Sequence, residues 1–399
     1  MHRYPFCHRT SCALLLLATL TLSAFGQGKE PIVTIQDAPP AMIIAVGDLN
    51  GDGRADIALV EALPTKPPTS TPAFRLHLLF QKDGKFAMPA AKIIALGATA
   101  PSGLAIGDFD GDGRHDLAVG LRVERSLSLF LGSESFEKEH RSRYGNDTGA
   151  GGVSTGRVNK SGRADFLTGA AWRQWQGNDR FGEAYFAGLE RNDNWRSTLA
   201  DMDRNGTDDV IFTTYSSAKL DVPSNNRVRI FYGPFLKMQI LQPADAAQVV
   251  TLNSPFMASD KPLLGKVMAG DLNDDSQLDL VVPAAGKTLV YHQNSPTGFS
   301  ENANPTFVIE DATPLLVTDL NGDKLCDIAF LPTNEAGIAL WYQQKDKPLT
   351  ANSLAACPRI AIPKMTGVVA SGDLDGDGRP EIIVGLSGRG LAIVPLPRR

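Results

Sequence analysis

The sequence predicts an all-β fold, a seven-bladed β-propeller, on three observations. A polar phrase recurs along the chain, each copy precedes a short apolar run, and helical periodicity is hard to find. A repeat of about fifty residues with room for four short strands is the period of a propeller blade. The copies account for residues 27–399 without a linker, so we expect a single domain. A stack of separate hairpins or an open solenoid is the competing architecture.

The recurring phrase has the pattern D-x-[DN]-x-[DN]-x-x-x-[DE], followed by apolar residues. It reads "GDLNGDGRADIALV" from Gly47, "GDFDGDGRHDLAVG" from Gly107 and "GDLDGDGRPEIIVG" from Gly372. An apolar stretch usually precedes it, so each copy predicts a strand, a tight polar loop and a second strand. The seven copies begin at Asp48, Asp108, Arg157, Asp201, Asp271, Asp319 and Asp373.

The two ends of the chain favour closure of the ring. Only two strand candidates, "EIIVGLS" and "GLAIVPL", follow the last loop, which leaves the seventh blade one strand short. The segment "PIVTIQD", residues 31–37, precedes the first unit and can supply the missing strand. An N-terminal strand that pairs with the seventh blade would cover an open sheet edge, and open edges promote aggregation.

Residues 1–26 have the composition of a signal peptide. A short basic start precedes the apolar run "CALLLLATLTLSAFG", and Ala24 and Gly26 are small residues of the kind that signal peptidase requires. We therefore expect cleavage before Gln27 and a secreted or periplasmic protein, with an N-terminal membrane anchor as the alternative. No other long apolar stretch occurs, so no membrane span is expected in the mature chain.

Charge and cysteine content limit the classes of partner. The formal net charge is -5, and loss of Arg3 and Arg9 with the signal makes it -7, with no basic stripe for nucleic acid. We expect a monomer that binds no nucleic acid. Only Cys326 and Cys357 remain after cleavage, and they either form a disulfide or stay as two partly buried thiols.

The charged loops predict calcium sites. Carboxylates crowded into so short a loop repel one another unless a cation neutralises them, and calcium takes roughly six to eight oxygen ligands. Alternate residues of a tight loop can all point at one centre. In the first loop we assign Asp48, Asn50, Asp52 and Asp56 as side-chain ligands and the carbonyl of Arg54 as a fifth.

Five further loops receive the same assignment, with side chains from the first, third, fifth and ninth loop positions and a carbonyl from the seventh. These ligands are Asp108, Asp110, Asp112, Arg114 and Asp116; Asp201, Asp203, Asn205, Thr207 and Asp209; Asp271, Asn273, Asp275, Gln277 and Asp279; Asp319, Asn321, Asp323, Leu325 and Asp327; and Asp373, Asp375, Asp377, Arg379 and Glu381.

The seven loops are not equivalent. Gly53 permits a sharp turn at the sixth position of the first loop, whereas Ser276 and Lys324 occupy that position in the fifth and sixth loops. We expect weaker binding or backbone strain there. The third loop begins with Arg157 and has one carboxylate, so we expect a metal-free third blade in which the charge of Arg157 fills the void. About six calcium ions are expected in total, and acidic turns without metal are the alternative.

The three phrases quoted above are similar to the FG-GAP-like/VCBS repeat family, which is related to the calcium-bearing blades of integrin α-subunit propellers. The resemblance covers about residues 40 to 390 and implies a seven-bladed propeller with calcium in the blade hairpins. The Phe-Gly pair that names the repeat is missing before these loops. The family includes adhesion and ligand-binding proteins, lectins and polysaccharide-degrading enzymes, so the fold does not settle the function.

The clearest candidates for catalysis lie in "EKEHRSRYGND". A lyase for acidic polysaccharides needs a base, an acid and a cation, and His140, Arg143 and Tyr144 are of these types. No second half of a site can be located in the sequence, and no hydrolase, zinc, phosphate-loop or dinucleotide motif occurs.

The third unit is also rich in aromatic residues, which are Trp172, Trp175, Phe181, Tyr185, Phe186 and Trp195. Exposed aromatic side chains can form a platform that stacks on sugar rings. We favour the alternative that these residues pack in the core of an atypical blade. We expect an exported, calcium-stabilised propeller that serves as a ligand-binding or adhesion module for an extracellular carbohydrate or protein. A polysaccharide lyase on the same scaffold is the alternative.

Overall fold

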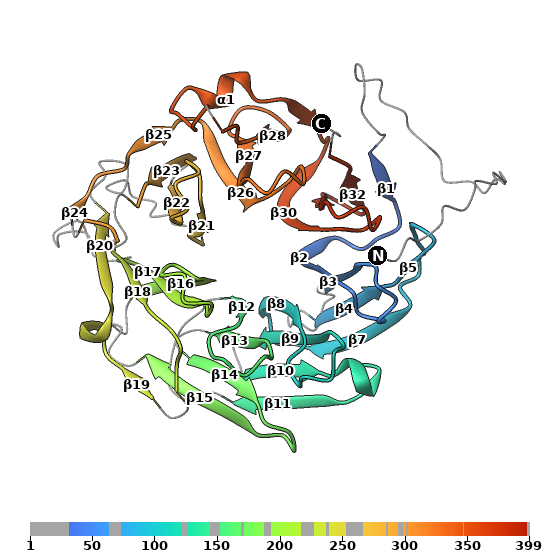
Figure 1. Ribbon diagram of the computed structural model, residues 1–399. Coiled ribbons are helices and arrows are strands. Elements are labelled where there is room, and N and C mark those ends of the chain that lie inside the picture. Colours follow the sequence, from blue (N-terminus) through green and yellow to red (C-terminus); the bar gives the residue numbers. More distant parts are fainter. Residues whose placement is uncertain are drawn as a thin grey trace, which may run out of the picture.

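Seven β-sheets form the blades of a ring around a central opening (Figure 1), which confirms the all-β, seven-bladed propeller. The computed structural model describes residues 32–63, 73–121, 126–143, 152–168, 171–186, 193–216, 227–236, 239–252, 266–284, 286–293, 298–300, 302–345 and 347–396. Helical structure in these residues is confined to α1 (Ser353–Ala356) and to two 3-10 turns, η1 (Gly132–Glu134) and η2 (Pro243–Asp245). None of the described helices has the length and apolar character needed to cross a membrane.

Blades one, two, five and six each have four antiparallel strands in chain order, from the axis outward. Their strands are β2 (Ala41–Gly47), β3 (Asp56–Leu63), β4 (Ala73–Leu79) and β7 (Lys92–Gly97); β8 (Pro101–Gly107), β9 (Asp116–Leu121), β10 (Ser126–Phe130) and β11 (Glu139–Arg143); β21 (Met268–Gly270), β22 (Asp279–Ala284), β23 (Lys287–Tyr291) and β25 (Phe307–Ile309); and β26 (Ala312–Thr318), β27 (Asp327–Pro332), β28 (Gly337–Trp341) and β29 (Arg359–Ala361). A small hairpin of β5 (Gln81–Lys82) and β6 (Lys85–Phe86) extends the first blade.

The third and fourth blades each gain a fifth strand at the outer edge. Their strands are β12 (Val153–Gly156), β13 (Asp165–Thr168), β14 (Ala171–Trp175), β15 (Phe181–Phe186) and β19 (Ile240–Leu241); and β16 (Asp193–Ala200), β17 (Asp209–Ser216), β18 (Arg227–Phe231), β20 (Gln248–Leu252) and β24 (Asn302–Ala303). In both blades the added strand is parallel to its neighbour and comes from a segment that follows later in the chain. The chain of one blade therefore covers the sheet edge of the blade before it.

The two ends of the described chain meet in the seventh blade. That blade contains β30 (Met365–Gly372), β31 (Glu381–Leu386) and β32 (Leu391–Val394), and its outermost strand is β1 (Val33–Ile35). β1 pairs antiparallel with β32, with Val33 opposite Ile393, and Figure 1 shows the blue and red ends of the chain side by side. The segment 31–37, expected to close the ring, thus contains the strand that occupies this edge.

The core is divided into seven clusters of buried apolar side chains, one between each pair of neighbouring blades. Successive side chains of a strand point to opposite faces of its sheet, so each blade contributes to the clusters on both sides. The cluster between the seventh and first blades joins Ile383 and Leu391 to Ile57 and Leu59. Because the seventh interface is packed like the others, the ring is closed rather than an open solenoid.

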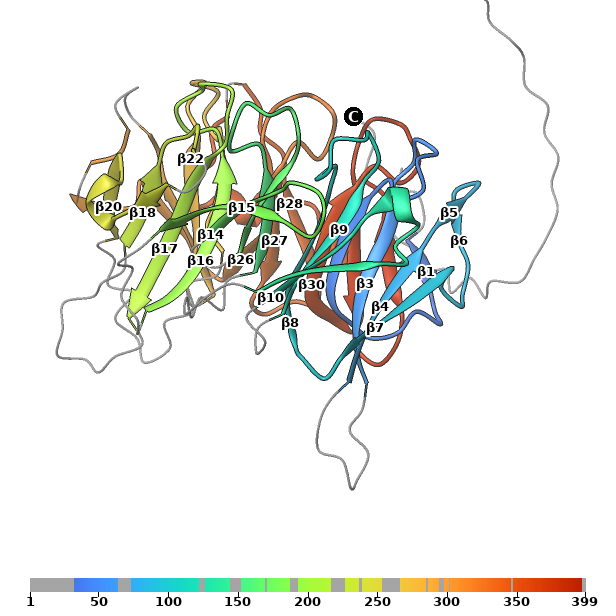
Figure 2. The ribbon, with the colours of Figure 1, turned by 90° about the horizontal axis from the view of Figure 1, so that it is seen from below.

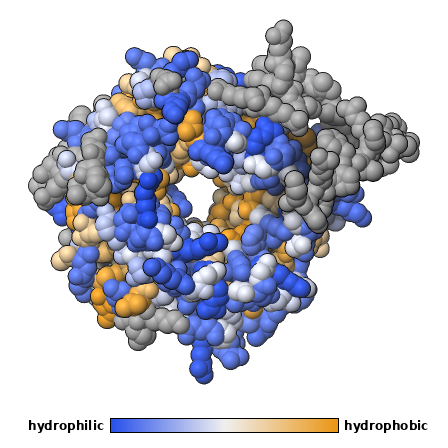
Figure 3. Space-filling model, viewed as in Figure 1, coloured by the Kyte–Doolittle hydropathy of each residue, from blue (hydrophilic) through white to orange (hydrophobic). Residues whose placement is uncertain are grey.

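The strand order also positions the charged loops. Each loop joins the innermost strand of a blade to the second strand, so all seven loops lie on one face of the ring, which is the upper edge in Figure 2. The same face is turned to the viewer in Figure 3, where hydrophilic residues surround the central opening and hydrophobic residues form part of its wall.

Cys326 and Cys357 are both free thiols, so of the two alternatives, a disulfide or two unpaired cysteines, the structure has the second.

Candidate metal centres

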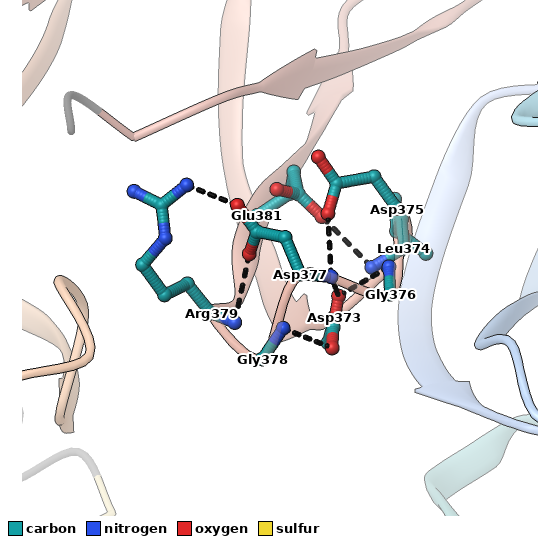
Figure 4. Close-up of polar contacts among 8 residues, drawn as sticks. All are labelled: Asp373, Leu374, Asp375, Gly376, Asp377, Gly378, Arg379 and Glu381. Atoms are coloured by element: carbon teal, nitrogen blue, oxygen red, sulfur yellow. Dashed lines mark hydrogen bonds and ion pairs between the residues drawn. The ribbon is translucent and has the colours of Figure 1, made fainter. Parts of the chain in front are cut away.

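The loop of the seventh blade shows the local geometry that the repeated phrase produces (Figure 4). One carboxylate oxygen of Asp373 accepts the backbone N–H groups of Gly376 at 2.7 Å and Asp377 at 3.1 Å, and the other accepts that of Gly378 at 2.8 Å. Asp375 in turn accepts the N–H of Asp377 at 3.0 Å. Short acidic side chains favour such turns because they reach the backbone two to five residues ahead. The side chains at the first, third and fifth positions are therefore held over the same loop.

The turn positions require backbone conformations that glycine adopts most readily. Gly376 and Gly378 in the seventh loop have φ values of 78° and 86°. In the fifth and sixth loops, Ser276 and Lys324 have φ values of 71° and 70°, although their side chains make this region unfavourable. The backbone strain expected in these two loops is therefore present.

The ninth-position carboxylate is buried and joins the loop to the end of the third strand. In the sixth blade, one oxygen of Asp327 accepts the N–H of Leu320 at 2.9 Å, and the other accepts the N–H of Gln343 at 2.9 Å. Asp56, Asp116, Asp209 and Asp279 make the same pair of contacts in their own blades. The ninth position is thus a structural anchor as well as a candidate ligand.

Burial of this anchor has an electrostatic cost. It raises the pKa of five ninth-position carboxyls to about 7, in Asp116, Asp209, Asp279, Asp327 and Glu381. The backbone donors lower the pKa in part, and neighbouring carboxylates of the same loop raise it further. A bound cation would remove this cost because it favours the ionised carboxylate.

Three loops bring carboxylate oxygens close enough to share one ion. Within each group the oxygens lie within 4.8 Å of one another, and the groups are Asp108, Asp110 and Asp116; Asp201, Asp203 and Asp209; and Asp373, Asp375 and Glu381. Oxygens bound to a common calcium ion at roughly 2.3–2.6 Å lie at such separations. These all-oxygen donor sets suit a hard cation, so the residues fit calcium in these three blades.

The first, fifth and sixth loops carry asparagine at the third position. There the amide donates to the carboxylate two residues later, from Asn50 to Asp52 at 3.2 Å, from Asn273 to Asp275 at 3.0 Å and from Asn321 to Asp323 at 3.0 Å. The amide relieves part of the repulsion between the carboxylates of its loop. Three ligand carboxylates remain in each of these loops, the same number as in the fourth loop, where the amide of Asn205 donates to Asp203 at 3.0 Å.

The third loop differs from the expectation in the position of Arg157. Arg157 is exposed and lies beside Asp208 of the fourth blade, which accepts the Arg157 backbone N–H at 2.6 Å. The charge of Arg157 therefore does not fill the loop interior, and Arg163 is the cation that acts on Asp165. Asp165 is fully buried next to the indole of Trp172 without a well-formed hydrogen bond, and burial raises its pKa to about 7.

Adjacent loops contact each other directly, which sequence reasoning missed. The backbone N–H of Ala164 donates to the carbonyl of Asp108 at 2.9 Å, and that of Asp208 donates to the carbonyl of Arg157 at 2.7 Å.

The sequence analysis also did not identify the residues that donate to the ninth-position carboxylate. Their signal is a Gln or Gly two residues after the last apolar residue of the third strand, at Gln81, Gly132, Gly233, Gln293 and Gln343.

Of the three candidates for catalysis, only the side chain of His140 lies in the described residues. His140 is 2% exposed, and its ring lies between Asp179, at 2.5 Å from Nδ1, and Glu134, at 2.8 Å from Nε2. The hydrogen bond from His140 lowers the pKa of Asp179. With both nitrogens engaged, His140 joins the second and third blades and is not a base open to substrate. The side chain of Arg143 and the whole of Tyr144 lie outside the described residues.

The aromatic residues of the third unit pack in the core where they are described. Trp172 is fully buried against the fourth blade, and Trp175 is 4% exposed against the second. Trp175 also contacts the rings of His140 and Phe181, with centroids at 4.8 Å and 5.0 Å. These two tryptophans cannot form a carbohydrate platform. The side chains of Tyr185, Phe186 and Trp195 lie outside the described residues.

Comparison with known proteins identifies a repeat and a fold. Residues 319–384 match the model of the FG-GAP-like repeat. The β-propeller domain of Cps50 (Swd1) from Myceliophteria thermophila is 9% identical, with a TM-score of 0.52, over 92% of this chain and 99% of that one. No curated protein matches the sequence.

Two further structures are similar with TM-scores of 0.48. An Agrocybe aegerita lectin, described as recognising non-reducing terminal N-acetylglucosamine, is 15% identical over 86% of this chain and 88% of that one. Virginiamycin B lyase from Staphylococcus aureus is 13% identical over 92% of this chain and 99% of that one. At these identities the likeness concerns the fold alone.

Proposed function

We propose that this propeller with an FG-GAP-like repeat is an exported calcium-binding module that recognises a carbohydrate or protein ligand outside the cell. The observation that carries the proposal is the set of loops gathered on one face, three of which bring three carboxylates within 4.8 Å of one another. Calcium, when bound, supplies the positive charge that these groups lack. The face then has a fixed shape around the central opening, a suitable place for a ligand.

The loop residues have two tasks in this function. The side chains at the first, third, fifth and ninth positions hold the ion, and the ninth also ties the loop to the third strand. Because the third loop shares backbone hydrogen bonds with the second and the fourth, order in one of these loops supports order in the next. Export fits the function since extracellular modules with calcium affinities in the range of about 0.1 to 1 mM remain loaded outside the cell.

Calcium binding to the mature chain, residues 27–399, tests the first half of the proposal. We expect calcium to raise the melting temperature by several degrees and magnesium to raise it less, because magnesium demands a tighter octahedral site. The double variant Asp108→Asn/Asp110→Asn should lose one calcium equivalent in isothermal titration. Exposed Asp83→Asn in the hairpin of β5 and β6 is the matched control and should lose none. Equal melting temperatures with calcium and without any metal would overturn the proposal.

A ligand screen tests the second half. The loaded protein would be applied to arrays of glycans and of extracellular proteins, with the calcium-free protein in parallel. We expect retention that requires calcium, without turnover of the ligand. Release of unsaturated uronates from an acidic polysaccharide would instead show a lyase and overturn the proposal of a binding module.

A further inference from the structure

The loop of the third blade has the opposite charge to its neighbours. Residues 157–165 contain three cations, Arg157, Lys160 and Arg163, and one carboxylate, which gives a formal charge of +2. The neighbouring loops at 108–116 and 201–209 each contain four carboxylates and one arginine, which gives -3. A cationic loop thus lies between two strongly acidic loops on the same face.

Two of the three cations of this loop are exposed to solvent, whereas its carboxylate is buried. Arg157 and Lys160 are exposed, whereas Asp165 is fully buried. Lys160 has no hydrogen-bond or ion-pair partner among the described residues. Arg163 is half-buried, and its Nη1 donates to the carbonyl of Asp110 at 3.4 Å. An anion that approaches this point of the face therefore meets Lys160 first, with Arg157 exposed nearby beside Asp208.

The acidic loops lie close enough to control that approach. The third loop is hydrogen-bonded to both neighbours through Ala164 and Asp208, so their charges act well within the Debye length of about 8 Å at physiological salt. Without metal, each neighbour has a formal charge of -3, and its carboxylates other than the buried Asp116 and Asp209 repel an incoming anion. One calcium ion in each neighbour reduces the formal charge to -1. Loading of these two loops would therefore expose the positive potential of the third.

We propose that the third-blade loop is a binding site for an acidic polysaccharide, and that calcium in the second and fourth blades opens this site. The inference rests on the proposed function and names its ligand class. A polysaccharide with one carboxylate per two or three sugars can place a single charge on the third loop. Nucleic acid, with about one charge per 1.7 Å of duplex, would also press phosphates against the neighbouring carboxylates. The loops on either side therefore favour the sparsely charged polymer.

Fluorescence anisotropy with end-labelled hyaluronate oligosaccharides tests the proposal. We expect binding in calcium that weakens at least roughly tenfold after metal is removed, and that weakens with added salt. A neutral dextran oligosaccharide should not compete. Absence of hyaluronate binding in calcium, or equal binding with and without calcium, would overturn the inference. Tighter binding of single-stranded DNA of similar length would overturn the choice of polysaccharide.

Variants locate the site and examine the role of charge. Lys160→Ala and Arg157→Ala should each weaken binding roughly threefold to tenfold, while Lys82→Ala, an exposed lysine of the first blade, should leave it unchanged. Wild-type affinity in Lys160→Ala/Arg157→Ala would place the site elsewhere. The double variant Asp110→Asn/Asp112→Asn should restore part of the binding in metal-free buffer. If it restores none, calcium does not act through the charge of the second loop.

Melting curves of the same samples distinguish failure of this inference from failure of the proposed function. A rise in melting temperature with calcium but no hyaluronate binding would remove this inference and leave the calcium-binding module intact. Loss of both would remove the proposed function as well.

Discussion

Cys326 of the sixth blade packs directly against Gly270 at the end of the innermost strand of the fifth. A Cβ atom placed on Gly270 would clash with Cys326 Sγ and would come within 2.7 Å of Val317 Cγ1. Gly47, Gly107, Gly156 and Gly372 hold the equivalent position before their own loops, and each meets side chains of the next blade. The glycine that opens the repeated phrase is thus a contact point between blades.

Gly270→Ala should destabilise the protein by about 1–3 kcal/mol because the added methyl group overfills this interface. Urea denaturation with metal removed measures the change. The control is the same substitution in a Cys326→Ala background, where the cost should be smaller because the sulfur atom is gone. An equal cost in both backgrounds would show that the contact with Cys326 is not its origin.

Replacement of a ninth-position carboxylate should weaken the fold even without calcium. Asp279→Ala leaves the N–H groups of Leu272 and Gln293 without their buried acceptor, at a cost of about 2–4 kcal/mol. Unfolding in metal-free buffer isolates this effect from loss of a ligand. Asp274→Asn in the same loop is exposed and should change stability by less than about 0.5 kcal/mol. If the two variants behaved alike, the ninth position would have no structural role.

The repeat made the fold predictable, since a phrase that joins two strands at a fifty-residue period leaves few architectures. The parallel edge strands β19 and β24 were not predictable, because each is only two residues long. Each also pairs with the blade that precedes its own segment in the chain. The alternation of carboxylates in the sequence indicates which side chains share a loop, and the structure brings three carboxylates together in three of these loops. The position of Arg157 could not be predicted, because its partner Asp208 belongs to the next copy of the phrase. The pattern within one loop contains no information on contacts between loops.

The thiols of the native protein should be unreactive. Burial raises the pKa of Cys326 to about 12 and also raises that of Cys357, so neither forms the thiolate that attacks a disulfide reagent. The mature chain should release no chromophore from Ellman's reagent until denaturant is added, and then the equivalent of both cysteines. A reductant should leave its melting temperature unchanged. A fall in melting temperature with reductant would indicate a disulfide instead.

Removal of strain from the fifth loop should strengthen its calcium site. Ser276→Gly places a glycine where φ is 71° and relieves roughly 1 kcal/mol of left-handed strain, offset in part by the greater freedom of glycine when unfolded. We expect a net gain of a few tenths of a kcal/mol and tighter binding of one calcium ion by titration. Ser387→Gly, beyond the charged loop of the seventh blade and outside the left-handed region of φ, is the control and should stabilise nothing. A loss of affinity in Ser276→Gly would mean that the serine side chain assists the ion.

Stability without metal should fall as the pH rises. The five ninth-position carboxyls with a pKa of about 7 would titrate near 4 in the unfolded chain, so the folded state binds more protons between these values. A group whose pKa is raised by folding stabilises the fold below about pH 4 and loses that contribution as the pH passes 7. The protein stripped with a chelating resin should therefore melt at a lower temperature at pH 8 than at pH 5. Calcium selects the ionised carboxylates, so the rise in melting temperature that it causes should be larger at pH 8. A calcium effect that is greatest at pH 5 would contradict this assignment of charge.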